Sequence, residues 1–245
     1  MLRPYPAVLQ KLFDQNFGSG RIQVMNFGII GYSSFHGLRV LRREVLAYDP
    51  DYVIIRFGWN DLLASPTGKS FASVHNPWLE RLEDLAYRSR LFALLMYRGV
   101  PLGQTGMRTE GDGGGPVPWV TEVEYAWNLS RMIDLARAHG AIPILLDAPA
   151  APITPEMRAN KLFIASTGFE SFEQYLAAHD RYQVITERVA AEKDVQFLRT
   201  APSPEEAPKY FTAFDIPHPN QAGQDRIAYR LNAELTPTLV RKMRR

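Results

Sequence analysis

A carboxylate and an imidazole lie three residues apart near the end of the chain, in the segment Asp215-Ile216-Pro217-His218. This spacing lets Asp215 accept a hydrogen bond from the imidazole and hold one tautomer, so that the other ring nitrogen can act as a general base. Prolines on both sides of His218 predict a stiffened loop before the last helix. A histidine with a purely structural role in such a loop is the alternative interpretation.

Two earlier segments offer hydrogen-bond donors to an oxygen that gains negative charge. In Gly58-Trp59-Asn60-Asp61 the short Asn60 side chain carries amide hydrogens that can stabilise an oxyanion. In the segment 26–34, glycines at Gly28 and Gly31 permit a tight turn and let backbone amides approach a substrate without an intervening Cβ. An Asn-Asp turn and a glycine turn before a helix explain the same residues without chemistry.

The elements that must position these residues alternate between apolar, strand-like runs and segments of helical periodicity. This alternation predicts βαβ units in an α/β protein with a mostly parallel sheet, and we expect one domain over residues 1–245. All three segments follow a strand or precede a helix, where open α/β sheets bind their ligands. Strands are predicted at residues 22–26, 52–57, 142–147 and 195–198, and helices at 7–17, 37–47, 78–97, 120–139, 172–193 and 221–240.

Composition excludes several classes of protein. A chain of 245 residues with 46% hydrophobic and 22% charged residues can bury a large core, and its net charge of +2 is too small to indicate a nucleic-acid partner. The absence of cysteine rules out disulfides and thiolate metal sites, and the histidines lack ligand spacing, so we expect neither metal nor cofactor. No apolar run approaches the roughly 18 residues of a membrane span, and the compartment stays open.

The remaining candidate motifs have ordinary explanations. The glycine-rich stretch 99–118 is followed by prolines rather than by the Lys and Ser/Thr of a phosphate-binding loop, and we expect a surface loop. Tryptophans can stack on sugars, but core packing is the simpler role for those at positions 59, 78, 119 and 127. Surface or helix-cap positions are expected for His36, His75, His139 and His179, which have no carboxylate at the spacing of the Asp215 segment.

Taken together and in this order, the three segments resemble the conserved blocks of the GDSL/SGNH hydrolase family. Residues 26–34 resemble its glycine block, 58–61 its Gly-x-Asn-Asp block, and 215–218 its terminal Asp-x-x-His block, continued by Pro219-Asn220 and Gly223. The resemblance implies a flavodoxin-like three-layer α/β/α sandwich and ester hydrolysis through an acyl-serine intermediate. It also implies roles for four residues: Gly31 and Asn60 as oxyanion-hole donors, His218 as the base and Asp215 as its partner.

One block of this pattern is absent. The family's nucleophilic serine lies in a Gly-Asp-Ser block after a first strand, upstream of the helix predicted at residue 7, and the sequence contains neither. Ser19, in a Gly-Ser-Gly turn, and Ser33 and Ser34, which suit a helix N-cap, are weak substitutes. We expect an amino-terminal truncation, and hence a chain that is inactive and prone to aggregate, because a lost strand leaves backbone groups unpaired.

Three functions are compatible with these observations. The first is a serine esterase acting on acyl or acetyl esters of small molecules or carbohydrates. The second is an acyltransferase of the same family, in which a sugar hydroxyl replaces water as the acceptor. The third is a binding domain that keeps the groove without the nucleophile. No nucleic-acid partner and no membrane segment are expected in any of them.

Overall fold

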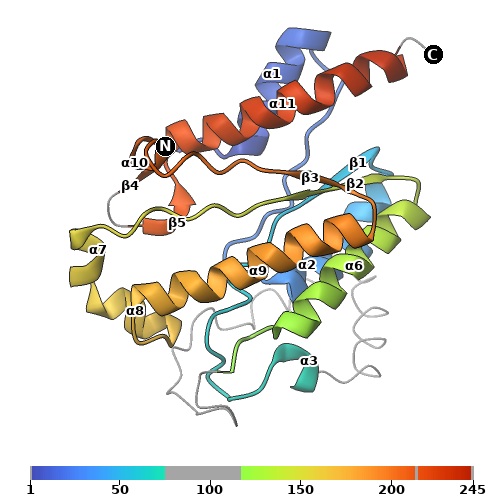
Figure 1. Cartoon of the computed structure of the whole chain (residues 1–245). Helices are drawn as coiled ribbons and strands as arrows, with labels where there is room; N and C mark the ends of the chain where they lie inside the picture. Colours follow the sequence, from blue (N-terminus) through green and yellow to red (C-terminus); the bar gives the residue numbers. More distant parts are fainter. Residues whose placement is uncertain (1, 75–116, 213–214, 244–245) are drawn as a thin grey trace, which may run out of the picture. The chain divides into compact units, whose positions relative to one another are not determined.

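The computed structural model describes residues 2–74, 117–212 and 215–243, and Figure 1 shows the order of their helices and strands. The elements are α1 (Tyr5–Phe17), α2 (Ser34–Arg43), the 3-10 helix η1 (Val45–Tyr48), β1 (Tyr52–Ile55), α3 (Phe71–Val74), α6 (Glu122–Ala138), β2 (Ile142–Leu146), α7 (Pro155–Ala159), α8 (Lys161–Thr167), α9 (Phe172–Glu192), β3 (Gln196–Leu198), α10 (Ala207–Tyr210), β4 (Phe211–Thr212), β5 (Asp215–Pro219) and α11 (Gln221–Met243).

The strands confirm the predicted α/β class. Strands β1 and β2 pair in parallel, with Tyr52 beside Ile142 and Ile55 beside Leu145, and the sheet order is β1-β2-β3. Parallel strands need a long crossover connection, and helix α6 lies in the one before β2. Four of the five residues of β2 are buried, as expected for a strand covered on both faces.

The chain forms two compact units that interleave along the sequence. The first unit contains residues 1–29, 146–160 and 197–245, and therefore holds α1, α7, α10, the β4-β5 hairpin and α11. The second unit contains residues 30–145 and 161–196, with α2, β1, α6, α8 and α9. The organisation as one domain stays a prediction.

In the second unit, helices α2 and α9 both pack against α6. Leu129, Ile133 and Ala136 recur at helical spacing along α6 and are at most 1% exposed, so they form its buried face. The helix begins at a capping box: Thr121 N donates to the Glu124 carboxylate at 2.7 Å, and Glu124 N donates back to Thr121 Oγ1 at 3.3 Å. These bonds fix where α6 starts.

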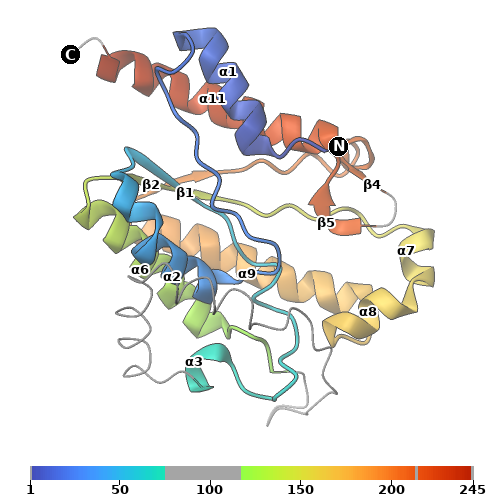
Figure 2. The same cartoon turned by 180° about the vertical axis from the view of Figure 1, so that it is seen from behind.

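In the first unit, helices from the two ends of the chain pack side by side, as Figures 1 and 2 show from opposite directions. Leu9 and Phe13 form the buried face of α1, and Ile227 and Leu231 are buried on α11. Polar bonds link the same two helices, such as Asn16 Nδ2 to Asn232 Oδ1 at 2.9 Å. The last helix thus holds the first.

Most predicted elements are present, with two corrections. The predicted strand at 22–26 is wrong: this segment is extended, but no strand among the described residues pairs with it. The Gln10 side chain makes hydrogen bonds to this backbone that a neighbouring strand would otherwise make. Gln10 Nε2 donates to Ile22 O at 2.9 Å, and Gln10 Oε1 accepts from Val24 N at 2.6 Å. The loop predicted around His218 is instead the strand β5, which pairs antiparallel with β4.

Other boundaries differ modestly from the predictions. Helix α2 begins at Ser34 rather than at residue 37, and the end of the predicted helix is the separate turn η1. The helices expected at 7–17, 120–139, 172–193 and 221–240 correspond to α1, α6, α9 and α11. The helix predicted at 78–97 and nearly all of the glycine-rich stretch 99–118 lie outside the described residues.

Candidate active site

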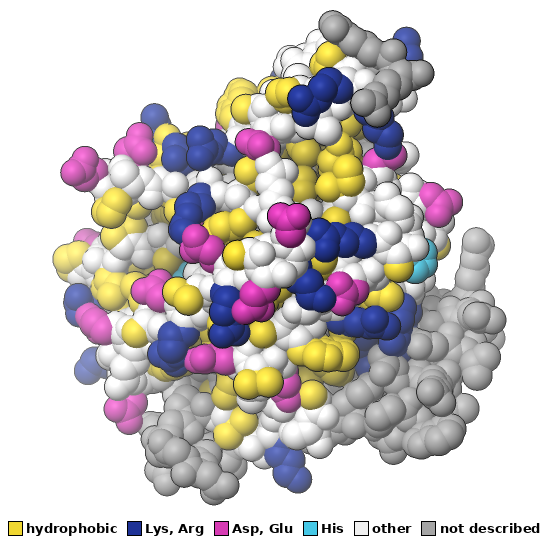
Figure 3. All heavy atoms as spheres, turned by 45° about the vertical axis from the view of Figure 1, so that its right-hand side comes forward, with side chains coloured by type: hydrophobic (Ala, Val, Ile, Leu, Met, Phe, Trp, Pro, Cys, Tyr) yellow, Lys and Arg dark blue, Asp and Glu magenta, His cyan; other side chains and the backbone are white. Residues whose placement is uncertain are grey.

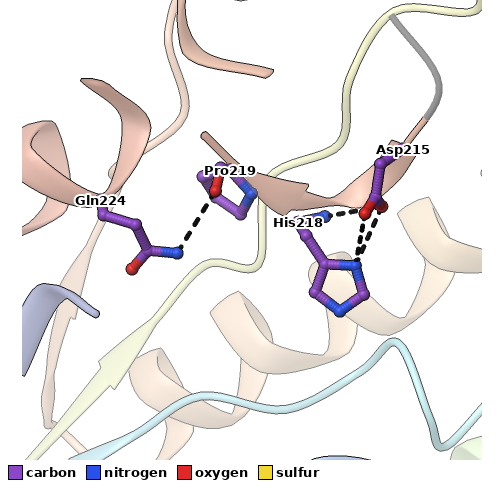
Figure 4. Close-up of polar contacts among 4 residues, drawn as sticks. All are labelled: Asp215, His218, Pro219 and Gln224. Atoms are coloured by element: carbon purple, nitrogen blue, oxygen red, sulfur yellow. Dashed lines mark hydrogen bonds and ion pairs between the residues drawn. The ribbon is translucent and has the colours of Figure 1, made fainter. Parts of the chain in front are cut away.

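Strand β5 brings Asp215 and His218 into contact, as the spacing predicts (Figure 4). Both carboxylate oxygens of Asp215 lie 2.9 Å from His218 Nδ1, and the backbone N of His218 donates to Asp215 Oδ1 at 3.2 Å. The His218 side chain is 74% exposed and that of Asp215 is 38% exposed. Such exposure weakens the charge interaction, so the contact chiefly orients the ring, with Nδ1 toward the carboxylate and Nε2 away from it.

Asn220 holds the β4-β5 hairpin to the start of α11. Its Nδ2 donates to Lys209 O at 3.0 Å and to Phe211 O at 3.1 Å, and its Oδ1 accepts from Gly223 N at 3.1 Å. Glycine is required at position 223 because a Cβ there would lie 2.4 Å from Tyr210 O. The Pro-Asn continuation of the last block therefore anchors the backbone that carries His218.

A buried carboxylate that the sequence reasoning missed braces the end of β2. Asp147 is 6% exposed and accepts from Thr200 N at 2.7 Å, Thr200 Oγ1 at 2.5 Å and Ala201 N at 2.9 Å. Arg226, on α11, donates to Thr200 O at 3.2 Å. These bonds tie the segment after β3 to both β2 and α11. The sequence signal that could have indicated this role is the position of Asp147 directly after an apolar strand.

The glycine and asparagine candidates lie on two neighbouring segments of the second unit. Gly31 has a φ of +82°, a conformation that favours glycine, and a Cβ there would meet no atom within 4 Å. Asn60 Nδ2 donates to Tyr32 O, the carbonyl directly after Gly31, at 3.0 Å. An amide NH2 has two hydrogens, and this bond uses one of them.

Asp61, the residue after Asn60, is fully buried at 0% exposure. Its Oδ1 accepts from Ser34 N at 2.8 Å and its Oδ2 accepts from Gly58 N at 3.0 Å. Burial raises the pKa of the Asp61 carboxyl to about 6, although hydrogen bonds from Ser34 and Gly58 favour the charged form. The sequence reasoning treated this residue only as part of a turn, because nothing in a single sequence shows which backbone groups a carboxylate will meet.

The weak nucleophile candidates occupy different environments. Ser33 is the N-cap of α2 and 1% exposed, and its Oγ lies 3.0 Å from His36 Nδ1. Burial, with a smaller effect of the Arg39 charge, lowers the pKa of His36 to about 4. Ser34 is 0% exposed and its Oγ accepts from Asn128 Nδ2 at 2.9 Å, whereas Ser19 is exposed in a turn. The N-cap expectation is confirmed for Ser33, whereas Ser34 is the first residue of α2 rather than its cap.

The expected surface or helix-cap position holds for one of the remaining histidines and is wrong for another. His139 is the C-cap of α6, as expected. His179 is 2% exposed inside α9, which contradicts the expected surface or cap position. Its ring stacks on Trp59 with centroids 3.6 Å apart, so this tryptophan packs against α9, as the core interpretation predicted. The same expectation is wrong for Trp127, which is 61% exposed. His75 lies outside the described residues.

Basic and acidic side chains interleave over the face shown in Figure 3, as a net charge of +2 implies. None of the helices within residues 2–74, 117–212 and 215–243 has both the length and the apolar character that crossing a bilayer requires. In this part of the chain, no group of three or more His, Asp or Glu side chains is arranged to hold a metal ion.

The structure shows a parallel α/β sheet and a direct contact between Asp215 and His218. The profile of the GDSL-like lipase/acylhydrolase family matches residues 2–226, and the chain belongs to this family. The resemblance noted in the sequence is therefore confirmed. A comparison with curated protein sequences finds no match.

Solved structures of similar fold are esterases and related hydrolases. The acetylxylan esterase Axe2 from Geobacillus stearothermophilus is 18% identical, with a TM-score of 0.56 over 95% of this chain and 81% of that one. LAE5, an alpha/beta hydrolase enzyme from the metagenome of Lake Arreo, is 19% identical, with a TM-score of 0.54 over 94% and 80%. A GDSL-like lipase from Bacteroides thetaiotaomicron is 15% identical, with a TM-score of 0.51 over 96% and 82%. These likenesses establish the fold.

Proposed function

We propose that this chain is a serine ester hydrolase that cleaves acyl or acetyl esters through an acyl-serine intermediate. The observation that carries the proposal is the Asp215–His218 contact, in which both carboxylate oxygens lie 2.9 Å from Nδ1. A carboxylate on Nδ1 favours the tautomer whose Nε2 is a proton acceptor. Membership in the lipase/acylhydrolase family supports the same chemistry.

Residues of this sequence can be assigned to the base, its partner and the oxyanion donors, but not to the nucleophile. His218 Nε2 takes the proton of the serine hydroxyl as it attacks the ester carbonyl, and later returns this proton to the leaving alkoxide. Asp215 stabilises the imidazolium formed in between. The Gly31 N–H and the second amide hydrogen of Asn60 bind the oxyanion of the tetrahedral intermediate, and losing one such donor typically costs about 100- to 1000-fold in turnover.

The nucleophile is the one part without a residue in this sequence. No Gly-Asp-Ser occurs among the 245 residues, and the environments of Ser33 and Ser34 suit a helix start. We propose that the serine belongs to a Gly-Asp-Ser segment outside this sequence, and that the chain alone is inactive. A substrate among carbohydrate acetates is supported by the acetylxylan esterase with the same fold.

The test compares p-nitrophenyl acetate hydrolysis by this chain with that by a longer chain containing an upstream Gly-Asp-Ser segment. Each is measured with His218→Ala, and with His139→Ala as a control at an exposed helix cap. Activity only in the longer chain, abolished by His218→Ala but not by His139→Ala, is the expected result. Hydrolysis by the short chain would place the nucleophile within this sequence. No hydrolysis of this ester or of acetylated xylan by either chain would refute the proposed function.

A further inference from the structure

One carboxylate holds two backbone segments that are distant in sequence. Asp61 accepts from Ser34 N at 2.8 Å and from Gly58 N at 3.0 Å, and 27 residues separate Ser34 from Asp61. Both donors are buried, and the carboxylate itself is 0% exposed. Water cannot replace these bonds without opening the unit, so the two segments are firmly joined at this point.

The two joined segments are those that carry the proposed oxyanion donors. Ser34 lies three residues after Gly31, and Gly58 lies two residues before Asn60. A second bond joins the same segments closer to the surface, from Asn60 Nδ2 to Tyr32 O at 3.0 Å. Two connections between a pair of short segments restrict both their separation and their rotation, whereas one connection restricts only their separation.

We propose that Asp61 is a positioning residue of the ester-hydrolysing site, because its carboxylate fixes the relative placement of the Gly31 backbone and the Asn60 side chain. The catalytic meaning of this placement rests on the proposed function, but the connection between the segments does not. Oxyanion stabilisation depends strongly on geometry, and a misplacement of about 1 Å can cost on the order of 100-fold in rate. Asp61 acts through the two donors and has no assigned contact with substrate.

A charged carboxylate suits this task better than a neutral group of the same shape. Both oxygens of the ionised form accept hydrogen bonds, so each backbone N–H has its own acceptor. In Asp61→Asn one oxygen becomes an NH2 that faces an N–H, so either the Ser34 bond or the Gly58 bond is lost. The variant therefore tests the connection with almost no change of volume.

Protonation of Asp61 tests the same connection without a mutation. Tyr125 from α6 and Tyr182 from α9 interact electrostatically with this carboxyl, and burial raises the pKa of both tyrosines, so neither titrates between pH 5 and pH 8. His36, near the start of α2, has a pKa lowered to about 4 by burial. Burial raises the pKa of Asp61 to about 6. The ring of His179 stacks on Trp59, so its own signals are followed in the same titration. A transition of Ser34 and Gly58 that coincides with the Asp61 carboxyl carbon, and not with the His179 ring, reports Asp61.

The first experiment is amide NMR and hydrogen exchange on the full chain, with Asp61→Asn and the control Asp49→Asn. Asp49 is an exposed residue of the same unit in the left-handed conformation, which Asn tolerates. In Asp61→Asn we expect roughly 10-fold faster exchange at Ser34 or Gly58, and shifted signals for the Gly31 amide and the Asn60 side chain. Asp49→Asn should leave all four unchanged. Unchanged Gly31 and Asn60 signals in Asp61→Asn would overturn the proposal.

If Asp61→Asn does not fold, the wild-type titration decides. The Gly31 and Asn60 signals should then shift with the same midpoint as the Asp61 carboxyl carbon, near pH 6. A carboxyl transition without movement of these two signals would overturn the proposal.

The activity measurement uses the longer, ester-hydrolysing chain. Asp61→Asn should lower kcat about 10- to 100-fold with KM for p-nitrophenyl acetate within about threefold, since the donors act in the transition state. Full activity in Asp61→Asn, alongside loss of activity in Asn60→Ala, would refute the positioning role of Asp61. The proposed function would remain supported. Shifted Gly31 and Asn60 signals without hydrolysis by any form would refute the function and leave the positioning role.

Discussion

Replacing Asp61 with Asn should change how the stability of the protein depends on pH. Burial raises the pKa of this carboxyl from an ordinary value near 3.8 to about 6, so the native state binds the proton more tightly than the unfolded chain. The resulting stabilisation is fully present below about pH 3.8 and is lost as pH rises through about 6. At roughly 1.36 kcal/mol per pH unit the full effect is about 3 kcal/mol, of which about 1.4 kcal/mol falls between pH 7.5 and pH 5.

The measurement is urea unfolding of wild type and Asp61→Asn at pH 5 and pH 7.5, followed by tryptophan fluorescence. Because the other titrating groups are common to both proteins, the difference between their free energies of unfolding isolates Asp61. The variant's deficit should be larger at pH 5 than at pH 7.5 by about 1.4 kcal/mol. A deficit that is equal at both values, or larger at pH 7.5, would mean that the Ser34 and Gly58 donors outweigh burial, and would refute this reasoning.

Three further substitutions test the supports of the candidate site. Asn220→Ala removes three side-chain hydrogen bonds and should lower the free energy of unfolding in urea by about 2 to 3 kcal/mol, and a loss below about 0.5 kcal/mol would contradict the anchoring role. Gly223→Ala should destabilise by about 1 to 3 kcal/mol in thermal unfolding, although Gly to Ala normally stabilises a helix, because the new Cβ meets Tyr210 O. Ser33→Ala should cost about 1 kcal/mol as a lost N-cap and leave ester hydrolysis by the longer chain intact, whereas loss of hydrolysis would contradict a purely capping role for Ser33.

Local spacing predicted the part of the site that depends on local structure. Asp215 and His218 touch through a local turn, in which the backbone N and the ring of His218 both meet the Asp215 carboxylate. The apolar stripe Leu129, Ile133 and Ala136 is buried for a similar reason, since helical spacing alone puts these residues on one face. Such features need no knowledge of distant neighbours.

Features that depend on a distant partner were not predictable in the same way. The segment 22–26 has the composition of a strand, but a strand also needs a neighbour, and Gln10 from α1 fills that place instead. The prolines around His218 indicated a loop, yet β4 offers a partner to which the segment pairs. His179 was expected at the surface because nothing in the sequence shows that Trp59 covers its ring.

The pairing of the two chain ends has a consequence for biosynthesis. Arg3 N donates to Gln221 Oε1 across 218 residues, and α1 packs on α11. The second unit ends at residue 196, so all of it is synthesised before the last helix, α11. Helix α1 is synthesised long before its partner α11, so Leu9 and Phe13 lack their α11 contacts in the meantime. In the nascent chain, the apolar face of α1 is therefore a surface that a chaperone could cover. If translation stalled before Gln221, α1 would lack its partner helix α11.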